Sequence, residues 1–237
     1  MTLEEILING AKEYGISLTG IQVQKFFKYK DVLMEWNKKI NLTAIEEDKD
    51  IVIKHYIDSL SALSYLEDTP LSVIDIGTGA GFPGIPLKIA YPILNIVLLD
   101  SLEKRVKFLN QAVADLDLKG ITAVHGRAED FGLKKEYREK FDIAVARAVA
   151  SLPVLLEYCM PFIKTGGRFI AMKGSSIEEL GASEKALRVL GGEIEKVDGI
   201  TLPFSDIKRN IVVIKKLRQT PTAYPRKAGK PSKEPLI

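Results

Sequence analysis

Val73-Ile74-Asp75-Ile76-Gly77-Thr78-Gly79-Ala80-Gly81-Phe82-Pro83-Gly84 is the stretch that decides the fold of this 237-residue chain. Apolar residues up to Ile76 predict a buried strand, and glycines crowd the turn that follows. Pro83 stands where a helix can begin, because its missing N–H would lack a helical partner there in any case. Glycine also lets the backbone approach a ligand closely. We therefore expect a strand, a ligand-binding turn and a helix.

On either side of this stretch, strand-like and helical segments alternate. Short β-rich runs occupy residues 71–76, 94–100, 121–124, 141–146 and 168–172, and helical stretches at 103–116 and 151–162 separate some of them. Such alternation predicts a parallel sheet with right-handed crossovers. After a helical stretch at 177–190, strand-like runs at 193–200 and 210–217 are joined by only about ten residues. So short a link favours a hairpin, so we expect the mostly parallel sheet to finish with an antiparallel strand.

Residues 1–66 have a helical pattern. Between Ile21 and Trp36 the apolar residues recur mostly every three or four positions, which is typical of an amphipathic helix. A second helical segment spans 51–66, and a polar connector with two asparagines, 37–43, lies between them. We expect an N-terminal helical cap (1–66), an α/β domain (67–217) and a C-terminal arm (218–237).

Composition excludes several classes of protein. Hydrophobic residues make up 46% of the chain, and no apolar run approaches the roughly 20 residues of a membrane span. The N-terminus is acidic, without a basic start followed by an apolar stretch, and the one cysteine cannot form an internal disulfide. These features favour a cytoplasmic protein without a membrane segment. Two isolated histidines and one cysteine predict no metal site.

The net charge of +3 is unevenly distributed. From Lys215 to Ile237 there are seven basic residues, one acidic residue and four prolines, so this stretch carries +6 and the remainder −3. Proline breaks helices and favours extended, solvated backbone. We expect a basic arm that binds a polyanion; the alternative is a tail kept soluble by its charge.

Two nucleotide-binding patterns compete in the glycine turn. Residues 79–84 satisfy G-x-G-x-x-G, but in that dinucleotide fingerprint the first glycine should close the strand, and here Gly77 does so. Counted from Asp75, the pattern is D-x-G-x-G-x-G. It resembles the first motif of class I S-adenosylmethionine (SAM) methyltransferases, and marks Asp75, Gly77, Gly79 and Gly81 as cofactor-binding. A turn without a ligand is the alternative.

Two further positions agree with this resemblance. Asp100 ends the next strand, where a carboxylate can accept hydrogen bonds from both ribose hydroxyls, although NAD enzymes also use an acid there. After the third strand, Ala128 and Glu129 fit the backbone N–H and acidic side chain with which methyltransferases of this class contact adenine. Glu129 has an alternative role as an acid favoured by the dipole of a helix N-terminus.

The methyl acceptor is narrowed by elimination. Methyltransferases that act on exocyclic amines of bases resemble one another in an N/D-P-P-Y/F run after strand four. At that place this chain has Ala146-Arg147-Ala148-Val149-Ala150-Ser151-Leu152-Pro153, so amine methylation is disfavoured. Methylation of pyrimidine C5 needs a cysteine nucleophile, and Cys159 lies in an apolar helical stretch. A guanine N7 fits what remains, because its lone pair carries no proton. Direct in-line attack then needs orientation rather than a general base, so no catalytic residue is assigned.

Several runs together resemble the bacterial small-subunit rRNA guanine-N7 methyltransferase family, also called the glucose-inhibited division protein B family. They are residues 36–43, 55–60, 75–86, 127–129, 146–149 and 224–227. The resemblance implies a Rossmann-like domain that transfers a methyl group from SAM to a guanine N7 in 16S rRNA, at position 527 in the 530 loop. It also implies that the cofactor site includes Gly77, Phe82, Ala128, Glu129 and Arg147.

The remaining candidates have less certain roles. Arg147 should not bind guanine O6 and N7 together, since that pair would cover the attacking N7 atom. It could instead hold O6, a phosphate or the methionine carboxylate of SAM. The alternative is a structural arginine paired with an acid. Asn37 and Asn41 could touch the base, or form a helix C-cap and a turn. His55 is either a packing residue or an RNA or site contact.

The expected partner is 16S rRNA, the small subunit or an assembly intermediate of it, bound by a monomer. Its phosphates would meet a set of basic residues: Arg226, Lys227, Lys230 and Lys233, with Lys38 and Lys39 if the connector faces the same side. Two rivals stay open. One is a small-molecule enzyme, either a metabolite methyltransferase or an NAD-dependent reductase. The other is a non-catalytic ribosome-assembly factor.

Overall fold

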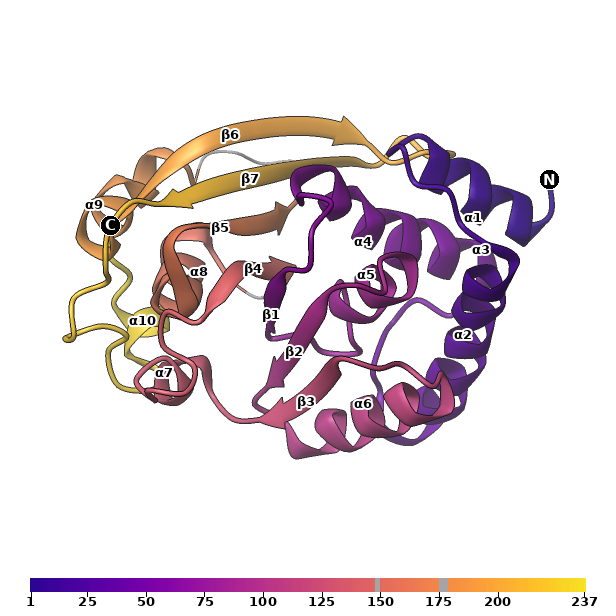
Figure 1. Cartoon of the computed structure of the whole chain (residues 1–237), viewed down its shortest axis with the longest axis horizontal. Coiled ribbons are helices and arrows are strands. Elements are labelled where there is room, and N and C mark those ends of the chain that lie inside the picture. Colours follow the sequence, from indigo (N-terminus) through magenta and orange to yellow (C-terminus); the bar gives the residue numbers. More distant parts are fainter. Residues whose placement is uncertain (148–149, 175–178) are drawn as a thin grey trace.

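A computed structural model describes residues 1–147, 150–174 and 179–237. Its centre is a seven-stranded sheet in the order β3-β2-β1-β4-β5-β7-β6 (Figure 1). The strands are β1 (Ser72–Ile76), β2 (Asn95–Asp100), β3 (Ile121–His125), β4 (Phe141–Arg147), β5 (Ile163–Lys173), β6 (Gly192–Thr201) and β7 (Lys208–Lys216).

The pairing confirms a mostly parallel sheet with a final antiparallel strand. Strands β1 to β5 pair in parallel, whereas β7 is antiparallel to both β5 and β6. The last strand of the chain therefore does not form the edge of the sheet, because it is inserted between β5 and β6.

Two sequence features, the start of the helical stretch at Ile177 and the end of the run 146–149, lie outside the described residues.

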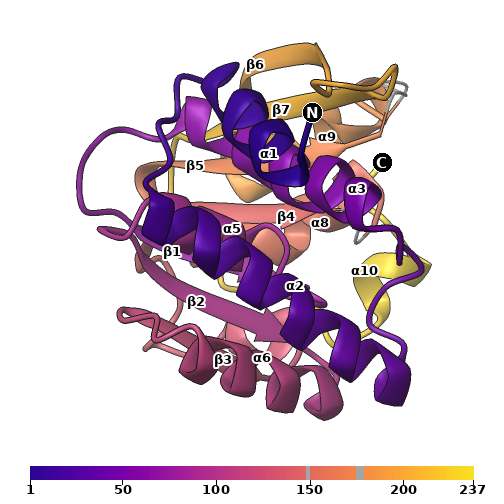
Figure 2. The same cartoon turned by 90° about the vertical axis from the view of Figure 1, so that its right-hand side faces the viewer.

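Helices cover both faces of the sheet (Figures 1 and 2). On β1, Val73 packs into one apolar core with the N-terminal helices, while Ile74 and Ile76 pack into a second core on the opposite face. This alternation follows from the two-residue period of a strand buried on both sides.

The helices are α1 (Leu3–Lys12), α2 (Gly20–Ile40), α3 (Asp48–Asp50), η1 (Ile51–Ile57), α4 (Asp58–Leu60), η2 (Ser61–Tyr65), α5 (Gly84–Ala90), α6 (Glu103–Asp115), α7 (Ala128–Phe131), α8 (Leu152–Cys159), η3 (Met160–Phe162), η4 (Gly181–Ser183), α9 (Glu184–Leu190) and α10 (Lys230–Lys233).

Helix α2 fixes the N-terminal part of the chain to the sheet. Thr19 and Gln22 form a reciprocal capping box at its start, and the Gln22 amide also donates to the carbonyl oxygens of Ile89 (3.0 Å) and Ala90 (2.9 Å) at the end of α5. Its side chains belong to the same apolar core as those of the strands. The helix reaches Ile40, so Asn37 lies in its last turn and not in the connector expected from the sequence.

The C-terminal segment, residues 218–237, is not the extended, solvated arm expected from its prolines. It folds back along α7 and α8 (Figure 1), and Leu236 is only 7% exposed. The guanidinium of Arg138 donates to the carbonyl oxygens of Thr220 (2.6 Å) and Tyr224 (2.9 Å). Such backbone contacts and apolar burial outweigh the solvation that the charges favour. Within the described ranges, no helix combines the length and apolarity needed to cross a bilayer.

The start of α5 gives a test of this packing. A Cβ on Gly84 would overlap the side chain of Leu98 and lie 2.8 Å from Oδ2 of Asp75, whereas nothing lies within 4 Å of a Cβ on Gly20. Gly84→Ala should therefore lower the free energy of unfolding by about 2 kcal/mol through overpacking. Gly20→Ala should leave it unchanged or raise it by up to about 1 kcal/mol. Urea unfolding measures both, and equal effects would contradict the tight approach at Gly84.

Candidate functional site

The turn after β1 is shaped by its glycines and by a tyrosine from α2. Gly77 continues the ladder by donating to the carbonyl oxygen of Leu99 (2.8 Å), and the backbone then turns away from the sheet. Gly81 has a φ of 89°, and a Cβ there would lie 2.7 Å from the hydroxyl oxygen of Tyr29. The buried Tyr29 hydroxyl itself donates to the carbonyl oxygen of Ala80. Only glycine fits this left-handed, crowded position.

Asp75 lies behind the turn, fully buried. Its Oδ2 accepts hydrogen bonds from the Thr78 hydroxyl (2.6 Å) and the Gly84 amide (2.8 Å). Burial raises the pKa of this carboxyl to about 7, although these hydrogen bonds favour the ionised form. Its Oδ1 has no hydrogen-bond partner among the described residues. Asp75 thus holds the glycine turn to the start of α5.

Asp100, at the end of β2, holds the other side of the turn. Its Oδ2 accepts from the Gly79 amide (2.9 Å) and its Oδ1 from the Leu102 amide (2.9 Å), while Arg105 lies 3.5 Å away. Each carboxylate oxygen can accept more than one hydrogen bond, so these contacts leave room for a ribose hydroxyl. Asp100 therefore orients the glycine turn, and its contact with a ribose stays a prediction.

A pocket opens beside this turn, at the carboxyl ends of β1, β2 and β3. It brings together three of the predicted cofactor residues, Gly77, Ala128 and Glu129. The remaining lining residues are Ile76, Leu99, Ser101, Gly126, Arg127, Ala150, Tyr158 and Ser232. Crevices at the carboxyl ends of the strands are the usual ligand sites of open α/β sheets.

Sequence reasoning missed the contribution of α8 and the C-terminal segment to this pocket. The Tyr158 hydroxyl and the Ser232 hydroxyl are 2.7 Å apart, and the Gly229 amide donates to Oε1 of Glu129 (2.8 Å). One signal was available: Glu157 is an acid within an otherwise apolar helical stretch, so it needs a cation. The basic segment supplies that cation through Arg226.

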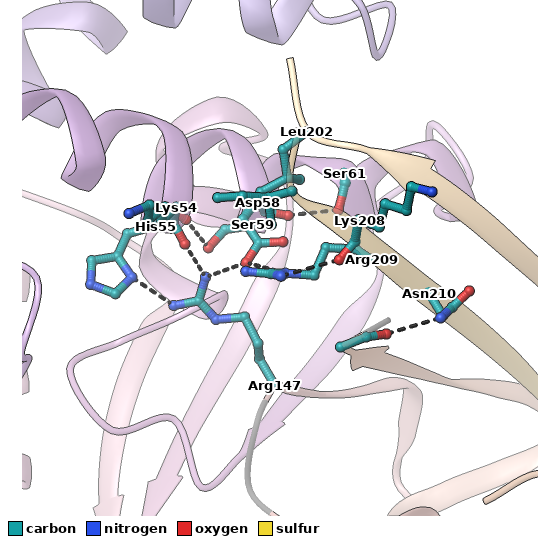
Figure 3. Close-up of polar contacts among 12 residues, drawn as sticks. Lys54, His55, Asp58, Ser59, Ser61, Arg147, Leu202, Lys208, Arg209 and Asn210 are labelled. Atoms are coloured by element: carbon teal, nitrogen blue, oxygen red, sulfur yellow. Dashed lines mark hydrogen bonds and ion pairs between the residues drawn. The ribbon is translucent and has the colours of Figure 1, made fainter. Parts of the chain in front are cut away.

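A second cluster contains Phe82 and Arg147, two predicted cofactor residues that both contact His55 of η1. The imidazole of His55 stacks on the Phe82 ring, with 4.3 Å between centroids and 13° between planes. The Arg147 guanidinium lies 5.0 Å from the Phe82 centroid and 3.1 Å from Nδ1 of His55 (Figure 3). The glycine turn therefore connects the pocket to this cluster, since Gly77 lies at one end of it and Phe82 at the other.

The hydrogen bonds define the protonation of His55. Because Arg147 can only donate, Nδ1 must accept, and the ring proton is then on Nε2, which faces the Thr43 hydroxyl at 2.9 Å. Burial, followed by the nearby Arg147 charge, lowers the pKa of His55 to about 3. His55 is thus a neutral, packed residue, the first of its two expected roles.

Asp58 joins two arginines at the same edge of the sheet. Its Oδ2 accepts from Nη1 of Arg147 (3.1 Å) and lies 3.3 Å from Nε of Arg209, which β7 supplies (Figure 3). The Asp58 side chain is only 3% exposed. Sequence reasoning missed Asp58 and Arg209, because their elements meet only in the folded sheet. Arg147 takes the alternative role of an arginine paired with an acid, while keeping its place beside Phe82.

The other predicted substrate residues are arranged differently. Oδ1 of Asn37 accepts from the amides of Leu42 (2.7 Å) and Thr43 (2.9 Å), and Asn41 ends α2 with a φ of 50°. Both therefore shape the connector, as their alternative roles required. Lys227 is exposed, whereas the guanidinium of Arg226 binds Glu157 of α8. The expected contact of these two residues with RNA stays a prediction.

The residues present fit a bound SAM. In the pocket, the Glu129 carboxylate can accept a hydrogen bond from an amino group such as that of adenine, and the glycine turn that Asp100 orients lies beside it. The glycine turn runs from Gly77 at this pocket to Phe82, and its backbone amides are groups to which the methionine part could bind. The acids also suit a cationic sulfonium.

The sheet order, the glycine turn and the acids at its sides define a class I SAM-dependent methyltransferase. More narrowly, this chain belongs to the rRNA small subunit methyltransferase G family (GidB), whose model matches residues 22–212. This confirms the resemblance noted in the sequence.

Curated relatives extend the match to the full chain. A protein of Acetivibrio thermocellus called ribosomal RNA small subunit methyltransferase G is 63% identical over 236 residues, covering 100% of this chain and 98% of its own length. One of the same description from Alkaliphilus oremlandii is 57% identical over 239 residues, covering 100% of both chains.

Solved structures share the fold at low identity. YcgJ from Bacillus subtilis has a TM-score of 0.55 at 13% identity, covering 69% of this chain and all of its own. A ribosomal protein L11 methylase from Lactobacillus delbrueckii has a TM-score of 0.52 at 18% identity, covering 70% of this chain and 79% of its own. These likenesses concern the fold alone.

His55 predicts a specific dependence of stability on pH. Its pKa of about 3 in the folded state is below the unfolded value of about 6.5, so the folded state binds fewer protons between these values. The free energy of unfolding should therefore fall as the pH drops below 6.5, and His55 should account for about 2 kcal/mol between about pH 7.5 and pH 5. In urea unfolding measured across this pH range, the His55→Asn variant should not show this fall in the free energy of unfolding. His125→Asn, which changes an exposed histidine, should retain it; identical curves for both variants would contradict the assignment.

Proposed function

We propose that this protein transfers a methyl group from SAM to N7 of a guanine in 16S rRNA, at position 527 in the 530 loop. Membership of the rRNA small subunit methyltransferase G family over residues 22–212 carries the proposal. The pocket beside the glycine turn supports it, because Gly77 and Glu129 line this pocket and Asp100 holds the turn through the Gly79 amide. A ribosomal substrate would place the protein in the cytoplasm.

Bound SAM supplies an electrophilic methyl group. The residues of this chain hold the cofactor and orient the base, and the N7 lone pair needs no proton removed before attack. The His55 ring faces Arg147 on one nitrogen and Thr43 on the other, so it is engaged as a neutral packing group. Arg147 is likewise engaged with Asp58, so it does not offer the bidentate pair that would cover N7.

The RNA-binding surface is proposed to lie next to the cofactor pocket. Lys227, Lys230 and Lys233 are exposed and flank Ser232, which lines the pocket. At the end of α2, Lys38 and Lys39 are exposed beside the connector that holds His55. Phosphates of an RNA whose guanine reaches the pocket could meet both groups of lysines.

The salt dependence of RNA binding tests this surface. Replacing Lys227, Lys230 and Lys233 together by alanine should reduce the slope of log affinity against log salt by about 2, since each lost phosphate contact to single-stranded RNA contributes about 0.7. The matched control replaces Lys119, Lys140 and Lys164, three exposed lysines at the opposite, amino-terminal edge of the sheet. Equal slopes for the two triple variants would sink the proposed surface.

The activity test uses 16S rRNA and small subunits from cells lacking this gene. Incubation with the protein and SAM should produce N7-methylguanosine at position 527, detected by mass spectrometry of nuclease fragments. With no general base to titrate, the single-turnover rate should vary by no more than about threefold between about pH 6.5 and pH 9.

Other outcomes separate the rivals. SAM binding without transfer to any RNA form would favour a metabolite methyltransferase or an assembly factor. NAD binding without SAM binding, measured by calorimetry, would favour the reductase. A rate that rises tenfold per pH unit would require a base that the proposal does not include.

A further inference from the structure

The C-terminal segment is anchored to the helix that forms one wall of the cofactor pocket. Glu157 of α8 is fully buried, and its carboxylate accepts from the backbone amide of Arg226 (2.8 Å) and from Nε (2.9 Å) and Nη2 (2.6 Å) of the same residue. A buried carboxylate needs such a cation, so the contact holds the segment at one place on α8. The same Nη2 donates to the carbonyl oxygen of Glu234 (2.8 Å), which ties the end of the segment to its start.

From this anchor the segment reaches two groups of the pocket. The Gly229 amide donates to Oε1 of Glu129 at 2.8 Å, and the Ser232 hydroxyl lies 2.7 Å from the Tyr158 hydroxyl. Glu129, Tyr158 and Ser232 all line the pocket, and Glu129 is 5% exposed. The backbone of the segment thus controls the orientation of a site carboxylate, independently of the lysine side chains that point to solvent.

The bond from Gly229 leaves Oε2 of Glu129 without a hydrogen bond among the described residues. A carboxylate oxygen at the pocket wall accepts a hydrogen bond, and the exocyclic amino group of adenine donates one. Because Oε1 is held by a backbone amide, the rotation of the carboxylate is restricted before a ligand arrives. A group oriented in advance loses less entropy on binding, and this increases affinity and selectivity.

We propose that residues 229–237 form part of the cofactor site, where the Gly229 amide positions Glu129 to accept from the adenine amino group and Ser232 closes the pocket against Tyr158. This rests on the proposed SAM-dependent function. Gly229 is a positioning residue, since it acts through Glu129. Removing the segment should therefore reduce not only the affinity for an adenosyl ligand but also the discrimination between adenine and hypoxanthine.

The test compares the full chain with one ending at Ala228, which keeps the pair between Arg226 and Glu157. Calorimetry uses S-adenosylhomocysteine and S-inosylhomocysteine, which carries a carbonyl in place of the amino group. The full chain should prefer the adenosyl ligand by about tenfold or more, since a carbonyl facing the Glu129 carboxylate cannot donate. The shortened chain should bind S-adenosylhomocysteine about tenfold more weakly and lose most of the preference.

Point variants keep the test valid if shortening impairs folding. Ser232→Phe adds bulk at the pocket wall and should weaken the binding of S-adenosylhomocysteine about tenfold or more. Lys119→Phe, at an exposed residue on the opposite, amino-terminal edge of the sheet, should change this binding by less than about twofold. Thermal unfolding of each variant checks that the chain is folded.

The outcomes separate this inference from the proposed function. If the full chain does not bind S-adenosylhomocysteine, the proposed function fails. If the full chain binds it and the chain ending at Ala228 binds it equally well with the same preference, the inference is overturned. It is also overturned if Ser232→Phe binds S-adenosylhomocysteine as tightly as Lys119→Phe does.

Discussion

Two carboxylates that hold the backbone of a glycine turn are the constraint on which the rest of this site depends. Asp75 binds the amide at the start of α5, and Asp100 binds the amide of Gly79 from the next strand. Glycine permits the left-handed turn, but it also costs conformational entropy, so the turn needs such contacts to keep one shape. Because both acids lie at strand ends, the position of the turn is tied to the sheet.

The turn separates the two parts of the site. On one side, the ends of β1, β2 and β3 form a pocket with the acidic and backbone groups that suit adenosine. On the other side, Phe82 packs on His55 and lies beside Arg147. Asp58 pairs with both Arg147 and Arg209, so helical and sheet elements meet at this edge of the site.

The charge of the C-terminal segment has two uses. Arg226 is committed to the buried Glu157, and Lys216, just before the segment, is fully buried against the carbonyl oxygen of Met160 (2.6 Å). Burial lowers the pKa of Lys216 to about 8. These cations bind the protein to itself, while the exposed lysines stay available to a polyanion. A count of basic residues cannot separate the two, because the distinction depends on which carboxylates the fold buries nearby.

Local patterns determined much of this protein. The glycine turn after an apolar strand, the acid ending the next strand and the alternation of elements were sufficient for a SAM-type sheet with an antiparallel strand near its end, because strand and turn chemistry act over a few residues. Asn37 and His55 were left with two roles each, since a polar residue near a helix end or an apolar face supports either role. Only the tertiary structure decided that Asp58 meets Arg147 and Arg209, and that Gly229 meets Glu129, 100 residues earlier in the chain. Such contacts depend on how far the chain folds back, and no local spacing encodes that distance.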